Sequence, residues 1–206
     1  MDVSTIVIDF GGVLVRTESR RSRQSWENRL GLEDGALDAI VFDSEVAREA
    51  TLGKATEEDI WRYIQNKLSL TNDEISQLKI DFWREDLLDN DLVNTLKKLR
   101  KKYQTAILSN IWTGGREFFR NHYGLGEKLT VDRIFVSCEM GLAKPDPEIF
   151  RCLAREMDVQ FDKILFIDDF KANITAALAL GINAHHFCDP DETISLLNSL
   201  VDSHGS

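Results

Sequence analysis

The sequence predicts an α/β fold, in which a Rossmann-like parallel sheet carries helices on both faces and a small helical cap is inserted after strand one. Two observations lead to this prediction. Short apolar runs, such as TIVID at 5–9 and KILFIDD at 163–169, are typical of strands buried on both faces of a parallel sheet. From about residue 87 onward such runs alternate with stretches of helical length, and this alternation indicates parallel strands with helical crossovers.

The bulk composition fits one core domain with a modest insertion, and it narrows the range of partners. The 206 residues include 43% hydrophobic residues and only 3 prolines, enough for a substantial core. The formal net charge of −10 argues against nucleic acid, because phosphate backbones are bound by clustered lysine and arginine. The 3 cysteines include no CxxC pair, and neither a signal segment nor a membrane-length apolar run is evident. We therefore expect a cytoplasmic protein that binds no membrane; its oligomeric state has no signature in the sequence.

The block 17–86 predicts a cap made only of helices, whereas 1–16 and 87–206 predict the core. Stretches with helical periodicity cover 20–30, 34–44, 56–68 and 71–83. Thr56 and Thr71 are each followed three residues later by an acidic residue, which is typical of a helix N-cap. Large aromatic residues recur at helical spacing in this block, and we expect them to form its core: Trp26, Trp61, Phe82 and Trp83.

The rest of the chain predicts strands and helices in alternation. Helices are expected over 89–103, over 146–157 with Pro147 in the first turn, over 171–181 and over 191–201. Strands are expected over 105–110, 134–139, 163–169 and 182–187.

Polar side chains follow the apolar runs where ligands bind in parallel sheets. The carboxyl ends of parallel strands meet at one edge, and ligands are held in the crevice outside that edge. Six residues occupy such positions: Asp9, Ser109, Asn110, Lys144, Asp168 and Asp169.

In this order, these residues resemble the four motifs of the haloacid dehalogenase superfamily, chiefly its phosphatases. Asp9 in DFGGVL matches motif one, Ser109 motif two, Lys144 motif three, and the pair Asp168-Asp169 motif four. The stretches TAILSNIW, VSCEMGLAKPDPEIF and FIDDFKANI are similar to the branch that holds the phosphatase domain of soluble epoxide hydrolase and bacterial sugar-1-phosphate phosphatases. GKATEEDIW is similar to a cap segment of those relatives.

The resemblance implies an Mg²⁺-dependent phosphohydrolase that acts on a small phosphorylated substrate. Asp9 would be the nucleophile and form an aspartyl-phosphate, a role that carboxylates can fill. Mg²⁺ prefers oxygen ligands, and Asp9, Asp168, Asp169 and the Gly11 carbonyl are the candidates in this chain. The residues expected to bind substrate are Gly11, Gly12, Ser109, Asn110, Trp112 and Lys144, with Ser109 and Lys144 on the phosphate oxygens and the two glycines offering free N–H groups.

Gly11 departs from the pattern of these phosphatases. They usually carry a second aspartate two residues after the nucleophile, and it protonates the leaving oxygen. A glycine carbonyl cannot transfer a proton, and loss of a general acid typically costs ~10²–10⁴-fold in rate. Three interpretations stay open: a slow phosphatase that uses water or another side chain such as Glu18, a phosphatase of activated esters, or an inactive protein that binds a phosphorylated ligand or a partner protein.

A 2-haloacid dehalogenase is a further alternative, because cleavage of a carbon–halogen bond by Asp9 needs no general acid. The acidic pair Asp168-Asp169 argues against it, because dehalogenases lack such a pair and need no Mg²⁺.

Several further residues have two interpretations or a structural one. Asn173 either orients the metal carboxylates or caps a helix, and the consecutive His185 and His186 are expected to be structural. Four arginines form either an anion-steering surface or a solvated helix face: Arg16, Arg20, Arg21 and Arg23.

Overall fold

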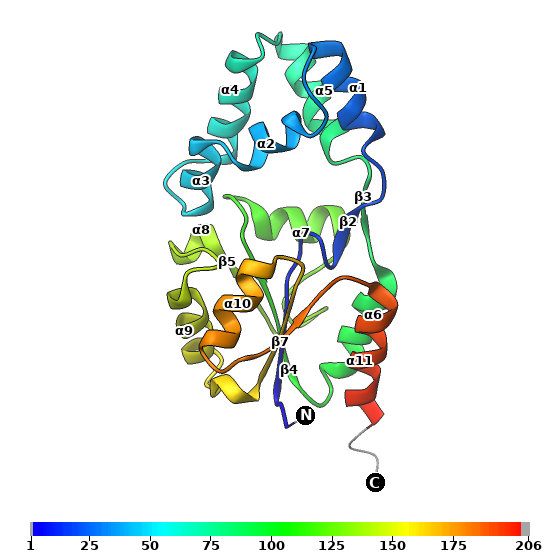
Figure 1. Cartoon of the computed structure of the whole chain (residues 1–206), viewed down its shortest axis with the longest axis vertical. Helices are drawn as coiled ribbons and strands as arrows, with labels where there is room; N and C mark the ends of the chain where they lie inside the picture. The colour runs from blue at the N-terminus through cyan, green and yellow to red at the C-terminus, as the bar shows by residue number, and fades with distance from the viewer. Residues whose placement is uncertain (1, 203–206) are drawn as a thin grey trace.

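The computed structural model describes residues 2–202 and contains a five-stranded parallel sheet in the order β5-β4-β1-β6-β7 (Figure 1). The strands are β1 (Thr5–Ile8), β4 (Gln104–Ser109), β5 (Arg133–Val136), β6 (Ile164–Asp168) and β7 (Asn183–His186). β1 lies in the middle, with β4 on one side and β6 on the other. The predicted α/β class is confirmed.

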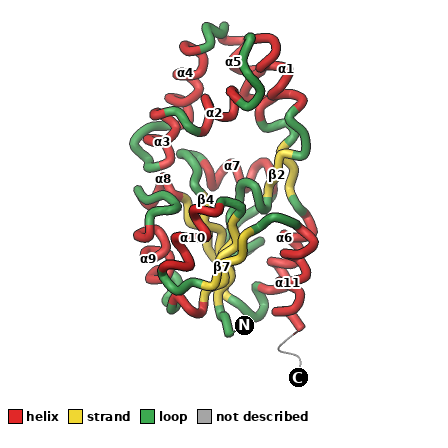
Figure 2. The backbone as a smooth tube through the Cα atoms, viewed as in Figure 1, coloured by secondary structure: helices red, strands yellow, loops and turns green. Residues whose placement is uncertain are grey.

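Helices cover both faces of this sheet because the strand residues are apolar on both sides. Ile6 and Ile8 of β1 belong to one buried cluster, and Val7 between them belongs to another. The helices packed in the first cluster are α6 (Asn90–Leu99), α7 (Gly115–Tyr123) and α11 (Pro190–Asp202). Those in the second are α9 (Pro147–Glu156) and α10 (Lys171–Ala179), on the opposite side in Figure 2.

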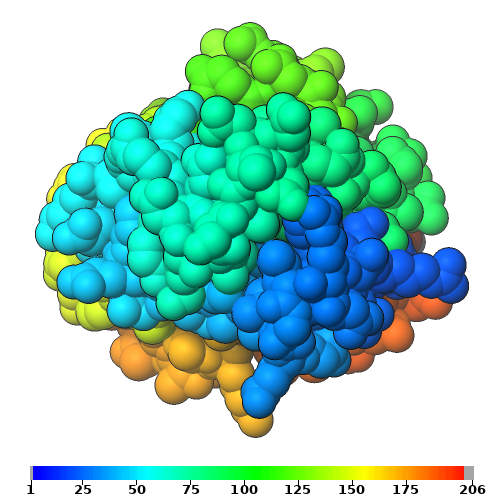
Figure 3. Space-filling model, turned by 90° about the horizontal axis from the view of Figure 1, so that it is seen from above, coloured from blue at the N-terminus to red at the C-terminus, as the bar shows by residue number. Residues whose placement is uncertain are grey.

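A second unit of five helices, which we call the cap, covers the carboxyl edge of the sheet (Figures 1 and 3). Its helices are α1 (Arg21–Leu30), α2 (Ala36–Phe42), α3 (Glu45–Thr51), α4 (Glu57–Lys67) and α5 (Asn72–Phe82). Trp26, Trp61 and Phe82 are buried in its core, as the sequence predicts. Thr56 and Thr71 each accept a hydrogen bond from the third helical residue and so complete capping boxes, which confirms both predicted N-caps.

Two short strands, absent from the prediction, join the cap to the sheet domain. β2 (Val15–Thr17) pairs antiparallel with β3 (Asp86–Leu88). The prediction that 17–86 contains no strand is therefore wrong at both of its ends. A strand of three residues is too short to show an alternating pattern, and its partner lies about seventy residues away in the chain.

Other departures from the predicted elements are local. β5 ends at Val136 instead of continuing to 139, because Ser137–Met140 form a helical turn, α8. The Ser137 hydroxyl there holds the backbone of Ile111 through both its N–H and its carbonyl, fixing the chain after β4. α3, α7 and a 3₁₀ turn, η1 (Phe161–Lys163), were not predicted.

The helices within residues 2–202 include none with the length and apolar composition needed to cross a bilayer.

Candidate active site

Three adjacent strands deliver the predicted polar residues to one place. Ile8, the last residue of β1, pairs with Ile107 of β4 and with Ile167 of β6. Asp9 and Asp168 therefore follow at the same level on neighbouring strands, and Ser109 ends β4 beside them. This level is the carboxyl edge of the sheet, at the point where the chain order reverses around β1.

Lys144 comes from the loop between α8 and α9 and bridges two of the aspartates. Its Nζ lies 2.9 Å from Oδ1 of Asp9 and 2.6 Å from Oδ2 of Asp168. The Lys144 side chain is buried. Burial lowers the pKa of Lys144, but the carboxylates of Asp9 and Asp168 outweigh this and raise it, so the side chain is an ammonium ion.

Asn110 holds the backbone of Lys144 from both sides. Its Nδ2 donates to the Lys144 carbonyl at 2.8 Å, and its Oδ1 accepts from the Lys144 N–H at 2.9 Å. Both functional groups of this side chain are thus used within the protein. Asn110 lines the cavity described below, but these two bonds assign its amide to the lysine loop, a role that the sequence did not predict.

Asp168 does not line the cavity described below, but it holds neighbouring groups of the site in place. It is fully buried, and its Oδ1 accepts from the Phe170 N–H at 2.8 Å and from Nδ2 of Asn173 at 2.9 Å. Its other oxygen is the partner of Lys144. Of the two interpretations of Asn173, the structure supports the one in which it orients an acidic side chain.

The carboxylates of Asp9, Asp168 and Asp169 form a cluster that is able to hold a metal ion. One oxygen of each lies within 4.8 Å of the others. Asp9 and Asp169 face the cavity, and no hydrogen bond among the described residues ends on the Gly11 carbonyl, which lies beside them. These are hard oxygen donors of the kind that Mg²⁺ prefers.

The charges in the cluster also fit a divalent cation. Three carboxylates face a single ammonium, so the buried site carries excess negative charge. Burial raises the pKa of Asp9 to about 7, with a further increase from Asp168 and an opposing effect of Lys144. Burial and the neighbouring Asp168 likewise raise the pKa of Asp169. A second cation would stabilise the ionised form of these carboxylates.

The two glycines after Asp9 differ in what surrounds them. Gly12 has φ +78°, and a Cβ on it would lie 2.2 Å from Oδ2 of Asp169, so only glycine lets this carboxylate approach. Its N–H donates to the Val15 carbonyl and is not free for a phosphate, contrary to the sequence prediction. A Cβ on Gly11 would meet nothing within 4 Å.

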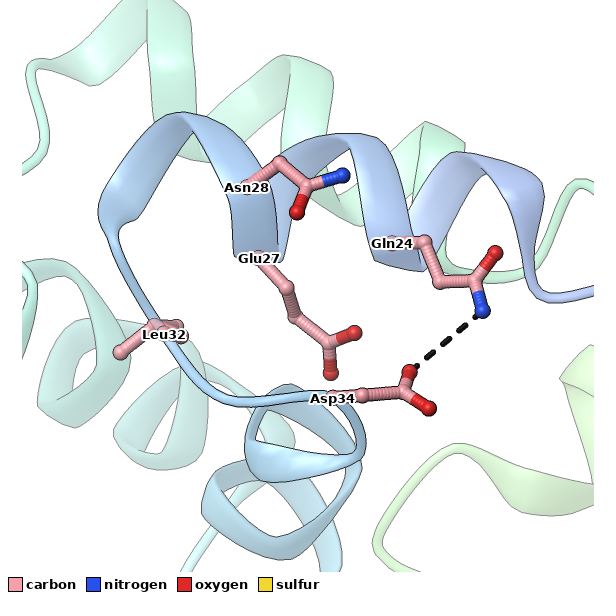
Figure 4. Close-up of a pocket in the computed structure, with 5 residues that line it drawn as sticks. All are labelled: Gln24, Glu27, Asn28, Leu32 and Asp34. Carbon is pink, nitrogen blue, oxygen red and sulfur yellow. Dashed lines mark hydrogen bonds between the residues drawn. The ribbon is translucent and has the colours of Figure 1, made fainter.

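A cavity of about 780 Å³ opens in front of these residues, between the cap and the sheet domain. The predicted residues Asp9, Ser109, Lys144 and Asp169 line it, and Trp112 does so as well. A separate hollow of about 310 Å³ lies in the cap at α1 and the loop after it, and shares no lining residue with the first (Figure 4). Figure 4 shows its polar side chains, of which Gln24 donates to Asp34.

Some predicted residues have other positions or partners. Trp83 packs against the cap core, as the sequence predicts, and it also lines the cavity, which the sequence does not predict. His185 and His186 are structural, as predicted, because their rings bond to the Thr193 hydroxyl and the Asp169 carbonyl.

The arginines after β1 are mostly paired within the protein, so neither sequence interpretation describes them well. Arg16 pairs with Asp89, and Arg20 contacts several cap carboxylates. Arg23 lines the cavity but is only 5% exposed, and its Nη2 donates to both oxygens of Asp86. Only the exposed Arg21 fits the solvated-face interpretation.

Comparison with known proteins identifies the family. A family model described as haloacid dehalogenase-like hydrolase matches residues 3–181. The chain belongs to the haloacid dehalogenase-like hydrolases. This match spans β1 through α10 and thus includes every candidate residue of the site.

Individual proteins are also similar to this chain over most of its length. A D-ribitol-5-phosphate phosphatase of Bacteroides thetaiotaomicron is 29% identical over 188 residues, 87% of this chain and 89% of that protein. A sesquiterpene phosphatase of Aspergillus oryzae is 25% identical over 200 residues, 95% of each chain. A haloacid dehalogenase family enzyme of B. thetaiotaomicron, solved with magnesium and inorganic phosphate, has the same fold, with a TM-score of 0.74, 21% identity, and coverage of 89% and 93%.

Proposed function

We propose that this hydrolase is an Mg²⁺-dependent phosphatase that cleaves the phosphate monoester of a small metabolite through an aspartyl-phosphate on Asp9. One observation carries the proposal. The Asp9 carboxylate lines a cavity at the strand edge, paired with the Lys144 ammonium and clustered with two further carboxylates. The phosphatase names of similar proteins that cover most of the chain support it.

In the proposed reaction, the free oxygen of Asp9 attacks phosphorus as the bond from phosphorus to the substrate oxygen breaks. Water then hydrolyses the aspartyl-phosphate and returns Asp9 as a carboxylate, with release of inorganic phosphate. Lys144 offsets the negative charge that builds on the transferred phosphoryl group, and the Ser109 hydroxyl donates to one of its oxygens. Asp168 and Asn110 hold Lys144 in place.

Asp9, Asp169 and the Gly11 carbonyl are the proposed ligands of Mg²⁺, with Asp168 behind them. When bound, the ion neutralises part of the charge on the carboxylates and the phosphate and so permits two anions to meet. We also propose that the cap and the core divide at residues 16/17 and 86/87, within the ribbon of β2 and β3.

Without an aspartate at position 11, proton transfer to the leaving oxygen falls to water in this proposal. Glu18, the alternative that the sequence suggested, is not among the residues that line the cavity. Esters whose leaving group needs little protonation should therefore react fastest.

Turnover of p-nitrophenyl phosphate tests the proposal against its two alternatives. We expect turnover that requires Mg²⁺, is abolished by EDTA and is lost in Asp9→Asn; Asp146→Asn, which changes a helix N-cap instead, is the matched control. Absence of turnover with retained phosphate binding would indicate a binding protein. Halide release from a 2-haloacid that persists in EDTA would indicate a dehalogenase.

A further inference from the structure

The wall of the large cavity is a continuous series of aromatic rings. It begins at Phe10, which follows Asp9 in the chain. The ring centroid of Phe10 lies 5.5 Å from that of Tyr123. Tyr123 lies 5.5 Å from Phe118, and Phe118 lies 5.5 Å from Trp83. Trp83 is in turn 5.9 Å from Phe42, in the cap. The series therefore extends from the residue next to Asp9 to the end of α2 in the cap, and all five rings line the cavity.

Most polar side chains in this cavity, away from the strand edge, already have partners within the protein. The exception is Arg48, whose guanidinium makes one hydrogen bond among the described residues, to the Asp43 carbonyl. The Asp86 carboxylate accepts from Thr17 and from Arg23, and the Asp86 carbonyl accepts from the Tyr123 hydroxyl. The Thr51 hydroxyl donates to the Ala47 carbonyl, and Glu57 accepts from the Trp61 indole. A polyol chain that enters the cavity would lose hydrogen bonds to water and find few free hydrogen-bonding groups in the protein. Each hydroxyl left unpaired would make binding weaker.

We infer that the organic part of the substrate is a large apolar group, so that the enzyme acts on the phosphate monoester of a hydrocarbon alcohol rather than of a sugar or polyol. The identity of the phosphate end rests on the proposed function. The hydrocarbon end rests only on the aromatic wall and on the mutual pairing of its polar groups. A volume of about 780 Å³ lies within the range of pockets that enclose whole organic ligands.

Binding of non-hydrolysable alkylphosphonates tests this inference independently of turnover. Propyl-, hexyl- and octylphosphonate, and the phosphonate of a five-carbon polyol, are titrated into the Mg²⁺-supplemented protein by calorimetry at several temperatures. We expect affinity to rise roughly two- to fourfold for each added methylene. Octylphosphonate should bind with a negative heat-capacity change, the mark of apolar burial, and at least tenfold more tightly than the polyol phosphonate.

Two variants at exposed apolar positions locate the binding site. Phe42→Ser removes a ring of the wall, and Ile80→Ser removes an exposed apolar side chain of α5 that does not line the cavity; Phe42 is 43% and Ile80 61% exposed. Phe42→Ser should weaken octylphosphonate binding about tenfold and leave methylphosphonate binding unchanged. Ile80→Ser should leave both unchanged. Equal effects of the two variants would overturn the assignment of the wall.

The outcomes separate this inference from the proposed function. If p-nitrophenyl phosphate is hydrolysed with Mg²⁺ but affinity does not change with chain length, or the polyol phosphonate binds as tightly as octylphosphonate, the inference fails and the phosphatase stands. If octylphosphonate binds through the aromatic wall and no ester is hydrolysed, the phosphatase fails and the apolar ligand stands. If no ester is hydrolysed and no phosphonate binds, both fail.

Discussion

The side-chain amide of Asn110 makes two hydrogen bonds to the backbone of Lys144. Its Oδ1 accepts from the Lys144 N–H at 2.9 Å, and its Nδ2 donates to the Lys144 carbonyl at 2.8 Å. Asn110 ends the apolar run of β4, and Lys144 belongs to a loop that follows β5, so the pair ties together two segments that the chain brings from different strands. The position of the ammonium between Asp9 and Asp168 depends on this loop.

We predict that Asn110→Ala lowers kcat by about 10- to 100-fold, because loss of both bonds lets the Lys144 loop move away from the reacting phosphate. Steady-state kinetics on p-nitrophenyl phosphate measure the effect. Asn183→Ala is the matched control, because Asn183 also donates to backbone carbonyls but does so at the start of β7, away from the site. A drop of similar size in the control would contradict the role of Asn110.

Gly11→Asp should speed the hydrolysis of unactivated alkyl phosphates, by as much as ~10²-fold, because it supplies a proton donor two residues after Asp9, the proposed nucleophile. The site has room for it, since a Cβ on Gly11 meets nothing within 4 Å and its φ is not in the left-handed region. The rate on p-nitrophenyl phosphate should change much less, because that leaving group needs little protonation. Equal acceleration on both esters would contradict a role of the new aspartate as proton donor to the leaving oxygen.

The neighbouring Gly12→Ala should have the opposite outcome. The new Cβ would lie 2.2 Å from Oδ2 of Asp169, and φ +78° is unfavourable for alanine. We expect the carboxylate to be displaced and turnover to fall by at least tenfold at any Mg²⁺ concentration. Circular dichroism that matches wild type would show that the loss comes from the site and not from unfolding. Wild-type kinetics in this variant would contradict the close packing of Gly12 and Asp169.

Asp169→Asn should raise the Mg²⁺ concentration needed for half-maximal rate by about tenfold or more, because a neutral amide replaces one of the proposed charged ligands. Asp168→Asn should instead lower the rate at saturating Mg²⁺, since Asp168 accepts from Lys144 and Asn173 and lies outside the cavity wall. Magnesium titrations of the two variants distinguish these roles. Identical titration curves would mean that both side chains act in the same way.

Arg23→Ala should lower the free energy of unfolding by about 3 kcal/mol, because it leaves the poorly exposed carboxylate of Asp86 without its charged partner, with only the Thr17 hydroxyl still donating to it. Arg29→Ala on the same helix is the control. Arg29 pairs with Glu74 at the surface, where its side chain is 56% exposed, and its removal should cost less than about 1 kcal/mol. Urea denaturation measures the free energy of unfolding of both variants. Equal decreases would contradict the stabilising role of the buried ion pair between Arg23 and Asp86.

The sequence predicts the sheet and the convergence of Asp9, Ser109, Lys144 and Asp168 because these features depend on short local patterns. An apolar run that ends in an acidic or hydroxyl residue indicates both a buried strand and its functional end. The capping boxes at Thr56 and Thr71 were predictable for the same reason, since their partners lie three residues away.

What the sequence does not predict depends on contacts between distant segments. The ribbon of β2 and β3, the pairing of Arg23 with Asp86 and the bonds of Asn110 join residues that lie 34 to about 70 positions apart. Trp83 packs against the cap core, as its helical spacing predicts, but its place in the cavity lining, at the C-cap of α5, has no signal in the sequence. Similarly, the hydrogen bond that occupies the Gly12 N–H is set by the turn that leads to Val15.

The ribbon of β2 and β3 is the connection through which the chain enters the cap and returns from it. The chain leaves the sheet domain at Val15 and returns at Leu88, directly opposite, so its departure and return points are neighbours. Helices can be lengthened, exchanged or rearranged beyond this junction while the strand that carries Asp9 stays in register with its neighbours. The same carboxyl edge with Asp9 can in this way lie beneath caps of different shape and so face molecules of different size.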